Sequence, residues 1–498
     1  MKGMEVIDKR SLNLEHYFGS FRKEVIGIDH HIPTPFGQMP MVYADWTASG
    51  RLYRPIEESI VNSIGPYIAN THTETSFTGS IMTHAYHEAR QIIKDHVGAK
   101  DTDILICCHS GMTGAINKLQ RILGLKVHEK FKDQCILSEE ERPLVVVSHM
   151  EHHSNQTSWL ETLAEVVVVP PNEDGLFSIE ELEKVLQKYT YKKTIIGAIT
   201  SCSNVTGIFT PYHKIAAKLH EYGGYCFVDF ACSAPYIEID MHPEDPAEKL
   251  DAIYFSPHKF LGGPGSPGVV IFDEELYDNK IPDHPGGGTV TWTNPWGEHR
   301  YFEEVELRED GGTPPFLQTI KAAKAMLLKE KMNCQKIRAR EEEMAKMVWD
   351  GFAEIDGLHL LADHIKSRLC IFSFYLEQAH YNLVVKLLSD KFGIQTRGGC
   401  SCAGTYGHYL LHVSREKSKE ITSAIDTGCN TSKPGWVRMS LHPIMTNEEV
   451  EYCVAAVKDI AENISDYEKA YRYDASKNEF FHVNDEGFEK KLAQRWFE

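Results

Sequence analysis

The chain has 498 residues, of which 42% are hydrophobic and 25% are charged, as is ordinary for a folded globular protein. This length allows two or three domains, or one large core with a smaller satellite. The formal net charge of −19 argues against a nucleic-acid partner, because binding to phosphates requires a positive field. A local basic pocket for one small anion remains compatible with this charge.

Targeting segments and disulfides are not expected from the sequence. Residues 1–10 carry interspersed charges and no apolar core, unlike a signal peptide. No apolar run approaches the ~18 residues that a membrane span needs. The twelve cysteines are scattered, and several fall in apolar runs, which favours reduced, buried thiols. We therefore expect a cytoplasmic protein without a membrane association.

The first hundred residues change character several times. Residues 1–40 are interrupted by prolines and predict an N-terminal arm or the first part of a small domain. A strand over 41–45 is followed by small residues, Ala48 among them, that allow close backbone approach. Helices are predicted over 54–64 and 82–97.

From residue 104 onward, apolar strand-like runs alternate with helical patterns. Such alternation predicts an α/β fold with a mostly parallel sheet and helices on both faces. Ligands of such sheets bind beyond the carboxyl ends of the strands, and the polar motifs of this chain lie there. The strands are expected over 104–108, 144–147, 166–169, 194–200, 225–229, 251–255 and 268–272, and the helices over 115–123, after the capping box at Ser178, and over 213–222.

A second α/β pattern follows the first. A helical stretch over 319–352 leads to strands over 369–375 and 435–441. The polar stretch 411–434 is predicted to be an inserted surface segment.

Three units are therefore expected. The arm (1–40) precedes a large domain (41–314), and a small C-terminal domain (315–498) follows it. The boundary is placed at the two prolines that precede the second helical stretch.

A lysine in a loop rich in Gly and Pro follows the strand over 251–255. Lys259, presented in this way, can form a Schiff base with an aldehyde cofactor, and Ser256 and His258 can hold an anion beside it. A solvated surface loop is the alternative for an isolated lysine.

A second anion site is predicted where a helix begins after the strand over 104–108. The backbone N–H groups around Gly111 and Met112 and the hydroxyl of Thr113 are suited to an anion, although many helices begin this way and bind nothing.

Three further polar side chains follow strands. His152 can stack on a flat heteroaromatic ring and Asn155 can fix a polar edge, although surface residues would give the same pattern. Asp229 ends an apolar strand, where a carboxylate needs a cation such as a protonated pyridine nitrogen. A helix cap or a structural ion pair is the alternative for Asp229.

The C-terminal part contributes arginines and thiols. Arg438 lies on a predicted strand and can bind a carboxylate bidentately, although an ordinary ion pair is the alternative. Glycines around Cys402 predict a mobile loop that can bring a thiolate to a substrate. Cys400 and Cys402 could ligate a metal, but no second Cys/His pair stands at zinc-type spacing nearby, so no metal site is predicted.

Together these residues resemble a pyridoxal-phosphate site. The chain is similar to the class V aminotransferase family of type I (aspartate-aminotransferase fold) pyridoxal-phosphate enzymes, and most similar to its cysteine desulfurase/selenocysteine lyase branch. The matching stretches run over 44–441. The resemblance implies a large domain with a seven-stranded, mostly parallel sheet, and a smaller α/β C-terminal domain.

The resemblance also implies roles for single residues. Lys259 would carry the Schiff base and shuttle the Cα proton, His152 would stack on the ring, and Arg438 would bind the substrate carboxylate. The turn 286–289 resembles one that reaches the partner subunit's phosphate, which implies a homodimer with shared active sites. Cofactor binding would fall to Gly111, Met112, Thr113, His152, Asn204, Asp229, Ser256, His258, Lys259 and Thr289, and substrate binding to Ala48, Asn155, Arg397 and Arg438.

Cys402 matches the desulfurase nucleophile in its spacing from Arg397. In that chemistry the cofactor activates L-cysteine or its selenium analogue, and the Cys402 thiolate attacks the sulfur. Alanine leaves and a persulfide remains, which a sulfur-acceptor protein would take up. An aminotransferase or another lyase in which Cys402 is not catalytic is the alternative, and a non-catalytic scaffold is a third hypothesis.

The sequence departs from the family pattern in three places. Cys232 stands where the family usually has Gln, and Cys400 and Ser401 stand where the desulfurase branch often has histidines. The segment between Cys402 and Arg438 is longer than in compact desulfurases. These departures bear on the reaction more than on the cofactor.

Overall fold

The computed structural model describes residues 13–71, 73–108, 110–431 and 433–498. The first residues of the predicted arm, including the stretch compared with a signal peptide, lie outside the described residues. None of the helices in the described part of the chain has the length and apolar character that crossing a bilayer requires.

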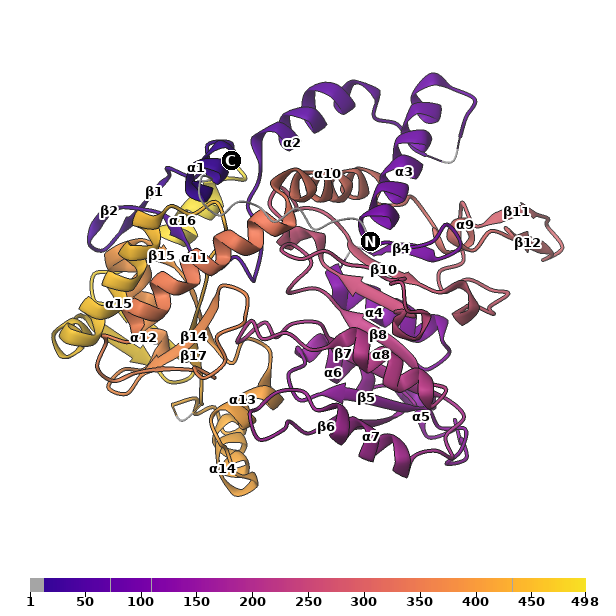
Figure 1. The fold of residues 1–498 in the computed structure, drawn as a ribbon. Helices are drawn as coiled ribbons and strands as arrows, with labels where there is room; N and C mark the ends of the chain where they lie inside the picture. The colour runs from indigo at the N-terminus through magenta and orange to yellow at the C-terminus, as the bar shows by residue number, and fades with distance from the viewer. Residues whose placement is uncertain (1–12, 72, 109, 432) are drawn as a thin grey trace.

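A seven-stranded sheet forms the centre of the large part of the molecule (Figure 1). Its strand order is β4-β10-β9-β8-β7-β5-β6, and only β10 runs antiparallel to its neighbours. The prediction of a mostly parallel sheet is therefore confirmed. The strands are β4 (Ile104–Cys108), β5 (Leu144–Ser148), β6 (Glu165–Val169), β7 (Ile195–Thr200), β8 (Tyr225–Asp229), β9 (Ala252–Phe255) and β10 (Gly268–Phe272).

Successive residues of the central strands enter two different cores. In β5, Leu144 and Val146 pack on one side of the sheet, and Val145 and Val147 pack on the other. Helices α4 and α6 cover one face, and α3, α7, α8 and α10 cover the other. Burial on both faces explains why these strands read as continuous apolar runs. The helices of this part are α2 (Arg54–Glu58), α3 (Phe77–His96), α4 (Gly111–Ile122), α5 (Glu129–Lys132), α6 (His153–Leu160), α7 (Ile179–Lys188), α8 (Tyr212–Glu221), α9 (Val305–Glu309) and α10 (Phe316–Met332).

The helices predicted over 82–97 and 115–123 begin earlier than predicted, at Phe77 and Gly111, and two further predicted helices differ from the observed ones in kind or continuity. The helix predicted over 54–64 is a short α-helix that continues as a π-helix, η1 (Ser59–Ile64). The single helix predicted over 319–352 is two helices that are separated at Asn333, whose φ is +67°. Asn tolerates the left-handed region better than most residues, and the Asn333 side chain accepts a hydrogen bond from the Lys336 N–H at the start of α11. The apolar pattern continues across this break, so periodicity alone missed it.

The C-terminal part is built on a four-stranded antiparallel sheet in the order β13-β14-β17-β16. Its strands are β13 (Leu358–Leu360), β14 (Ile371–Leu376), β16 (Arg397–Gly399) and β17 (Trp436–Ser440). The helices that follow α10 are α11 (Cys334–Phe352), α12 (Tyr381–Phe392), α13 (Gly404–Leu410), α14 (Arg415–Asp426), α15 (Asn447–Tyr467) and α16 (Phe488–Arg495).

The N-terminal segment packs on the C-terminal part. Helix α1 (Leu14–Arg22) contacts α11, and Arg22 forms a bidentate ion pair with Glu449 of α15 at 2.7 and 2.8 Å. Strand β3 (Val42–Tyr43) pairs in parallel with β15 (Ile394–Gln395). Figure 1 shows these indigo elements among the orange and yellow ones. The strand predicted at the start of the large domain therefore lies with the C-terminal elements.

Several elements project from the two cores (Figure 1). Helix α14 occupies much of the segment predicted as a surface insertion, and most of its residues are exposed. The remaining strands form three hairpins, which are β1 (His31–Thr34) with β2 (Gly37–Pro40), β11 (Val290–Thr293) with β12 (His299–Tyr301), and β18 (Tyr471–Asp474) with β19 (Glu479–His482).

Candidate active site

A cavity of about 220 Å³ lies between the sheet and the C-terminal part. Loops that follow β4, β5, β7, β8 and β9 line it on one side, and β16, β17 and the loop after β16 line it on the other. Predicted site residues from segments far apart in the chain therefore meet here. Those that line the cavity are Ala48, Gly111, Met112, Thr113, His152, Asn204, Asp229, Ser256, His258, Lys259, Arg397, Cys402 and Arg438.

Lys259 follows β9 in a single 3-10 turn, η4 (Pro257–Lys259). Gly50 packs against this turn and donates from its N–H to the His258 carbonyl at 2.9 Å. A Cβ at Gly50 would lie 1.9 Å from the Phe260 carbonyl oxygen, so only glycine permits this approach. Burial lowers the pKa of Lys259, which favours the neutral amine that attacks an aldehyde.

Asp229 is the last residue of β8 and is 3% exposed. Its Oδ1 atom accepts a 2.7 Å hydrogen bond from the Ala231 N–H. Burial raises the pKa of Asp229 to about 6, although the positive charge of Lys259 opposes this shift. A carboxylate this poorly solvated is suited to a cationic group in the cavity.

An anion cradle lies at the start of α4. Ser110 precedes the helix without a side-chain cap, so N–H groups of the first turn are available to a ligand. The Met112 N–H donates to Ser256 Oγ at 2.8 Å, which ties this turn to the lysine loop. Thr113 Oγ1 and Ser154 Oγ lie 2.7 Å apart at the same end of the cavity.

Two arginines share one carboxylate on the opposite wall. Arg438 Nη2 donates to Asp45 Oδ1 at 2.7 Å, and Arg397 Nε donates to Asp45 Oδ2 at 3.2 Å. Arg438 is 3% exposed, and its Nε atom has no hydrogen-bond partner among the described residues. Asn204 Oδ1 is likewise buried without a partner in the described part of the chain, while its Nδ2 donates to the Ser401 carbonyl at 2.7 Å. Unpaired buried polar atoms are rare, and a bound polar molecule would explain them.

Cys402 lies at the cavity mouth and is exposed. Ser401 and Cys402 have φ values of +51° and +56°, a left-handed conformation that is uncommon for residues other than glycine. His153 holds this loop on both sides, because its N–H donates to the Cys402 carbonyl at 2.7 Å and its Nε2 accepts from the Gly404 N–H at 3.0 Å. These two hydrogen bonds connect the loop that carries Cys402 to the start of α6.

His152 lines the cavity one residue before α6. Its Nδ1 atom accepts from the Ser154 N–H at 3.1 Å. Burial, with the positive charge of Lys259, lowers the pKa of His152 to about 3, so its ring is neutral at physiological pH. Burial likewise lowers the pKa of His258 to about 4.

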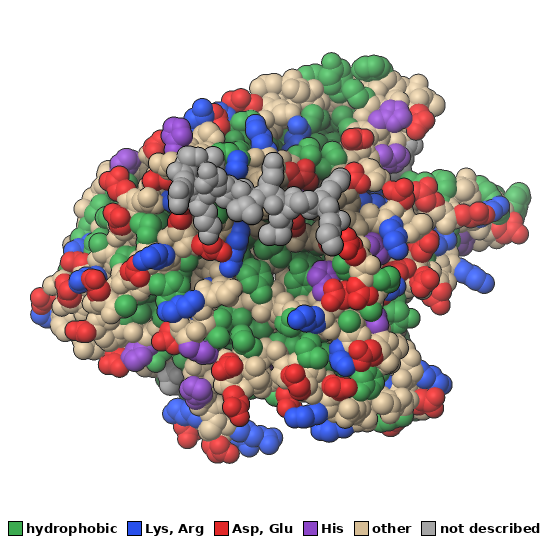
Figure 2. All heavy atoms as spheres, viewed as in Figure 1, with side chains coloured by type: hydrophobic (Ala, Val, Ile, Leu, Met, Phe, Trp, Pro, Cys, Tyr) green, Lys and Arg blue, Asp and Glu red, His purple; other side chains and the backbone are tan. Residues whose placement is uncertain are grey.

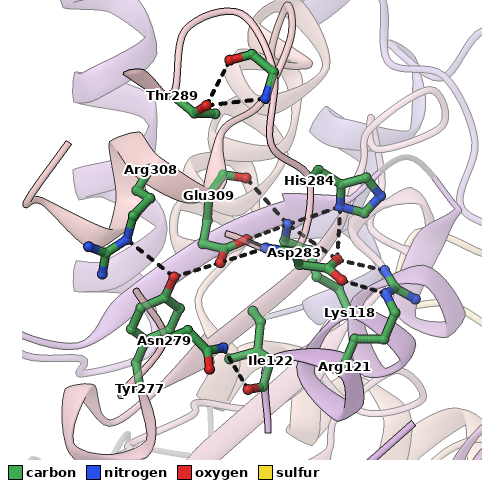
Figure 3. Close-up of polar contacts among 11 residues, drawn as sticks. Lys118, Arg121, Ile122, Tyr277, Asn279, Asp283, His284, Thr289, Arg308 and Glu309 are labelled. Carbon is green, nitrogen blue, oxygen red and sulfur yellow. Dashed lines mark hydrogen bonds and ion pairs between the residues drawn. The ribbon is translucent and has the colours of Figure 1, made fainter. Parts of the chain in front are cut away.

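Two predicted residues are not part of this cavity. Asn155 is fully buried behind it, where its Nδ2 donates to Glu151 and to the Ala198 carbonyl and its Oδ1 accepts from Tyr254. Thr289 Oγ1 donates to the Gly286 carbonyl at 2.7 Å, within its own turn. Figure 3 shows Thr289 above a separate cluster of charged residues.

That charged cluster fastens the segment around Thr289 to α4. Lys118 Nζ lies 2.8 Å from Glu309 Oε2 and 3.7 Å from Asp283 Oδ2, and Arg121 forms a bidentate pair with Asp283 at 2.7 and 2.9 Å (Figure 3). The Glu309 side chain has no exposed surface. The cluster therefore joins the helix of the anion cradle to the turn before the β11–β12 hairpin.

Sequence reasoning missed several residues that line the cavity. Asp45 also went unnoticed as a site residue, although it ends the predicted strand over 41–45 as Asp229 ends the predicted strand over 225–229, and that position was the available signal. The additional lining residues are Thr47, Ser110, Ser154, Thr200, Cys202, Ala231, Cys232 and Ser401. Of these, Cys232 and Ser401 were noted from the sequence only as departures from the family pattern.

The family model of the class V aminotransferases matches residues 42–453 of the chain. The chain belongs to this family. Members of the family use pyridoxal 5'-phosphate, so the chain is a pyridoxal-phosphate-dependent enzyme, and the resemblance predicted from the motifs is confirmed.

Similar curated proteins and solved structures agree with this family. The chain is 28% identical over 368 residues to a probable cysteine desulfurase of Halalkalibacterium halodurans, a match that covers 73% of this chain and 84% of that protein. It is 24% identical over 405 residues to a cysteine desulfurase of Haloferax volcanii, which covers 78% and 89%.

The fold is also that of solved desulfurases. The apo cysteine desulfurase of Thermococcus onnurineus aligns with a TM-score of 0.70 at 20% identity over 89% of this chain and 98% of that one. The Escherichia coli cysteine desulfurase CsdA aligns with a TM-score of 0.69 at 21% identity over 90% and 98%. The prediction of a type I pyridoxal-phosphate fold is thus confirmed.

The cavity fits pyridoxal phosphate by the chemistry of its side chains. Lys259 supplies an amine for the aldehyde, and Asp229 supplies a carboxylate for the ring nitrogen. The start of α4, with Thr113 and Ser256, supplies donors for the phosphate.

Proposed function

We propose that the chain is a cysteine desulfurase that moves sulfur, or selenium, from L-cysteine or its selenium analogue to Cys402. The observation that carries the proposal is that the Cys402 thiol lines the same cavity as Lys259 and Arg438. The names of the similar proteins from Halalkalibacterium halodurans and Haloferax volcanii support it.

In this proposal the residues on both walls of the cavity have roles in binding or proton transfer. Bound pyridoxal phosphate supplies an electron sink for bonds at the substrate α-carbon. Arg438 and Arg397 bind the substrate carboxylate, and Asp45 holds their guanidinium groups in place. Lys259, whose pKa burial lowers, carries a proton to and from the α-carbon.

Cys402 receives the sulfur. Its thiolate attacks the substrate sulfur, an S–S bond forms, and the carbon–sulfur bond breaks with its electron pair going to the carbon skeleton. Protonation of that carbon gives alanine, and the enzyme keeps a persulfide. Because Cys402 is exposed, a sulfur-acceptor protein could reach the persulfide from outside.

A homodimer with shared active sites is part of the proposal. Figure 2 shows apolar side chains gathered at the top of the molecule, over α2 and the start of α3. The exposed large apolar residues between the start of η1 and the start of α3 are Val61, Tyr67, Ile68 and Phe77, and the rings of Tyr67 and Phe77 lie 6.0 Å apart. Exposed apolar side chains gathered in one region of a protein with many surface charges favour contact with another protein surface. Thr289 does not line the cavity of its own chain. In a homodimer it would contact the ligand in the cavity of the partner subunit.

The deciding experiment is alanine and sulfide release from L-cysteine, with a reductant present. The wild type should release both products, and Cys402→Ser should release neither. Cys400→Ser is the matched control, because Cys400 lies two residues away and does not line the cavity. If Cys402→Ser still turns over an amino acid, the chain is instead an aminotransferase or another lyase in which Cys402 is not catalytic.

A further inference from the structure

Two more thiols line the cavity besides Cys402. Cys202 lies just after β7 and Cys232 lies just after β8, the neighbouring strand. Their Sγ atoms lie 3.8 and 3.7 Å from the same acceptor, the Ser203 carbonyl oxygen. Cys202 is 0% exposed and Cys232 is 5% exposed, and neither forms a disulfide. The pair is therefore shielded from bulk solvent. Cys232 keeps a small accessible surface at the cavity, and Cys202 lies covered beside it.

The two thiols differ in acidity. The neighbouring Cys202 thiol, aided by the positive charges of Lys259 and Arg438, lowers the pKa of Cys232. Burial raises the pKa of Cys202. A thiolate is the attacking species in thiol–disulfide chemistry, and a neighbouring thiol can then resolve the intermediate. Cys232 is suited to the first role and Cys202 to the second.

Other buried cysteines do not share this setting. Cys226 lies within β8, and neither Cys370 nor Cys453 lines the cavity. Burial raises the pKa of each of these three thiols. A thiol that faces only packed side chains has no electrophile to attack, so the Cys202–Cys232 pair is the one placed for chemistry among the buried thiols named here.

We propose that Cys232 and Cys202 form a dithiol that reduces a persulfide held in the cavity and releases it as sulfide. Where the persulfide is the one on Cys402, the inference rests on the proposed function. A small persulfide that enters the cavity would meet Cys232 in the same way.

The step balances without a further reagent. The Cys232 thiolate attacks the outer sulfur of the persulfide, so the original S–S bond breaks and the donor thiol is regenerated. Cys202 then loses its proton and attacks Cys232 at its inner sulfur, which expels hydrosulfide. The persulfide sulfur is reduced to sulfide, and the two thiols are oxidised to one disulfide. The dithiol therefore acts once, and an external thiol must restore it.

The test is a single turnover of the pyridoxal-phosphate-loaded enzyme without air or added reductant. One equivalent of L-cysteine is supplied, alanine and sulfide are measured, and free thiols are alkylated for peptide mapping by mass spectrometry. We expect about one sulfide per alanine and a Cys202–Cys232 disulfide, as the stoichiometry of the step requires. The sulfide-to-alanine ratio should fall at least about tenfold in Cys232→Ser and Cys202→Ser, and stay unchanged in Cys226→Ala.

The outcomes separate the two proposals. Alanine without sulfide, with both thiols still alkylated in the wild type, would overturn the dithiol and leave desulfuration intact. Absence of alanine would refute desulfuration, and inorganic polysulfide added to the wild-type enzyme then decides the inference. Formation of the Cys202–Cys232 disulfide by polysulfide supports it, and its absence overturns it. The peptide mapping after L-cysteine and the peptide mapping after polysulfide both use the wild-type enzyme. A variant that fails to fold therefore does not affect either result.

Discussion

Arg438 Nη2 donates a 2.7 Å hydrogen bond to Asp45 Oδ1, and both side chains are buried. Asp45 lies two residues after β3 and is bridged to Ser440 of β17. The N-terminal segment, through its pairing with the C-terminal part, thereby sets the direction of the arginine that faces the cavity.

Asp45→Asn should raise the KM for the amino-acid substrate by about tenfold and change kcat less, because an uncharged amide holds the two guanidinium groups more weakly. Steady-state kinetics over a range of substrate concentrations measure this. Asp29→Asn is the matched control, since Asp29 is an exposed aspartate of the same N-terminal segment. An unchanged KM in Asp45→Asn would show that the arginines are held without it.

Asp229→Asn should weaken cofactor binding. The carboxylate is buried with one backbone hydrogen bond, and an amide cannot compensate a cationic ring nitrogen. Loss of one partner of a buried charge pair costs about 3–5 kcal/mol, so the Kd for pyridoxal phosphate should rise by at least about 100-fold. Titration of the apoprotein by cofactor absorbance measures it, with the exposed Asp174→Asn as the control. Equal affinities would contradict the assignment of Asp229.

Much of the sheet was predictable because its strands are buried on both faces and read as continuous apolar runs. All seven strands of the large sheet fall where these runs predicted them. Lys259 and Asp229 were predictable for a related reason. Asp229 is the last residue of such a strand and Lys259 follows one, and the carboxyl ends of parallel strands converge on one edge of the sheet.

Contacts between distant segments were not predictable from local patterns. The Asp45–Arg438 pair joins residues 393 positions apart, and it depends on the pairing of β3 with β15. The approach of Cys202 to Cys232 depends on β7 and β8 being neighbours. Asn155 was expected at the substrate, but position along the chain does not reveal which way a side chain of α6 points.

Lys118→Met should destabilise the large part of the molecule. Lys118 is buried against Glu309, and its removal leaves a carboxylate with no exposed surface and, among the described residues, no other ion-pair partner. Breaking a buried pair from one side costs about 3–5 kcal/mol of unfolding free energy, which chemical denaturation measures. Lys132→Met is the matched control, because Lys132 pairs with Glu161 at the surface and should cost at most about 1 kcal/mol. Equal losses in the two variants would contradict the role of the cluster.

Glu151 predicts a pH dependence of stability. It is fully buried beside the cavity wall, where its Oε1 accepts from the Thr200 N–H at 2.8 Å and its Oε2 accepts from Asn155 Nδ2 at 2.7 Å. Burial raises the pKa of Glu151 from 4.5 to about 8. Below pH 4.5 the side chain is protonated in both the folded and the unfolded chain. The protonated Glu151 therefore makes its full contribution to the free energy of unfolding there.

Between those two pKa values the unfolded chain releases this proton while the folded chain keeps it, so stability falls as the pH rises and levels off above about pH 8. Glu151→Gln carries no such proton. The Tm of the wild type should therefore fall more steeply than that of the variant between about pH 5 and about pH 8, with a slope difference of about one proton. The lost acceptor for Asn155 lowers the Tm of the variant at every pH alike, so the slope is the readout. Parallel pH profiles would show that Glu151 is ionised in the folded protein.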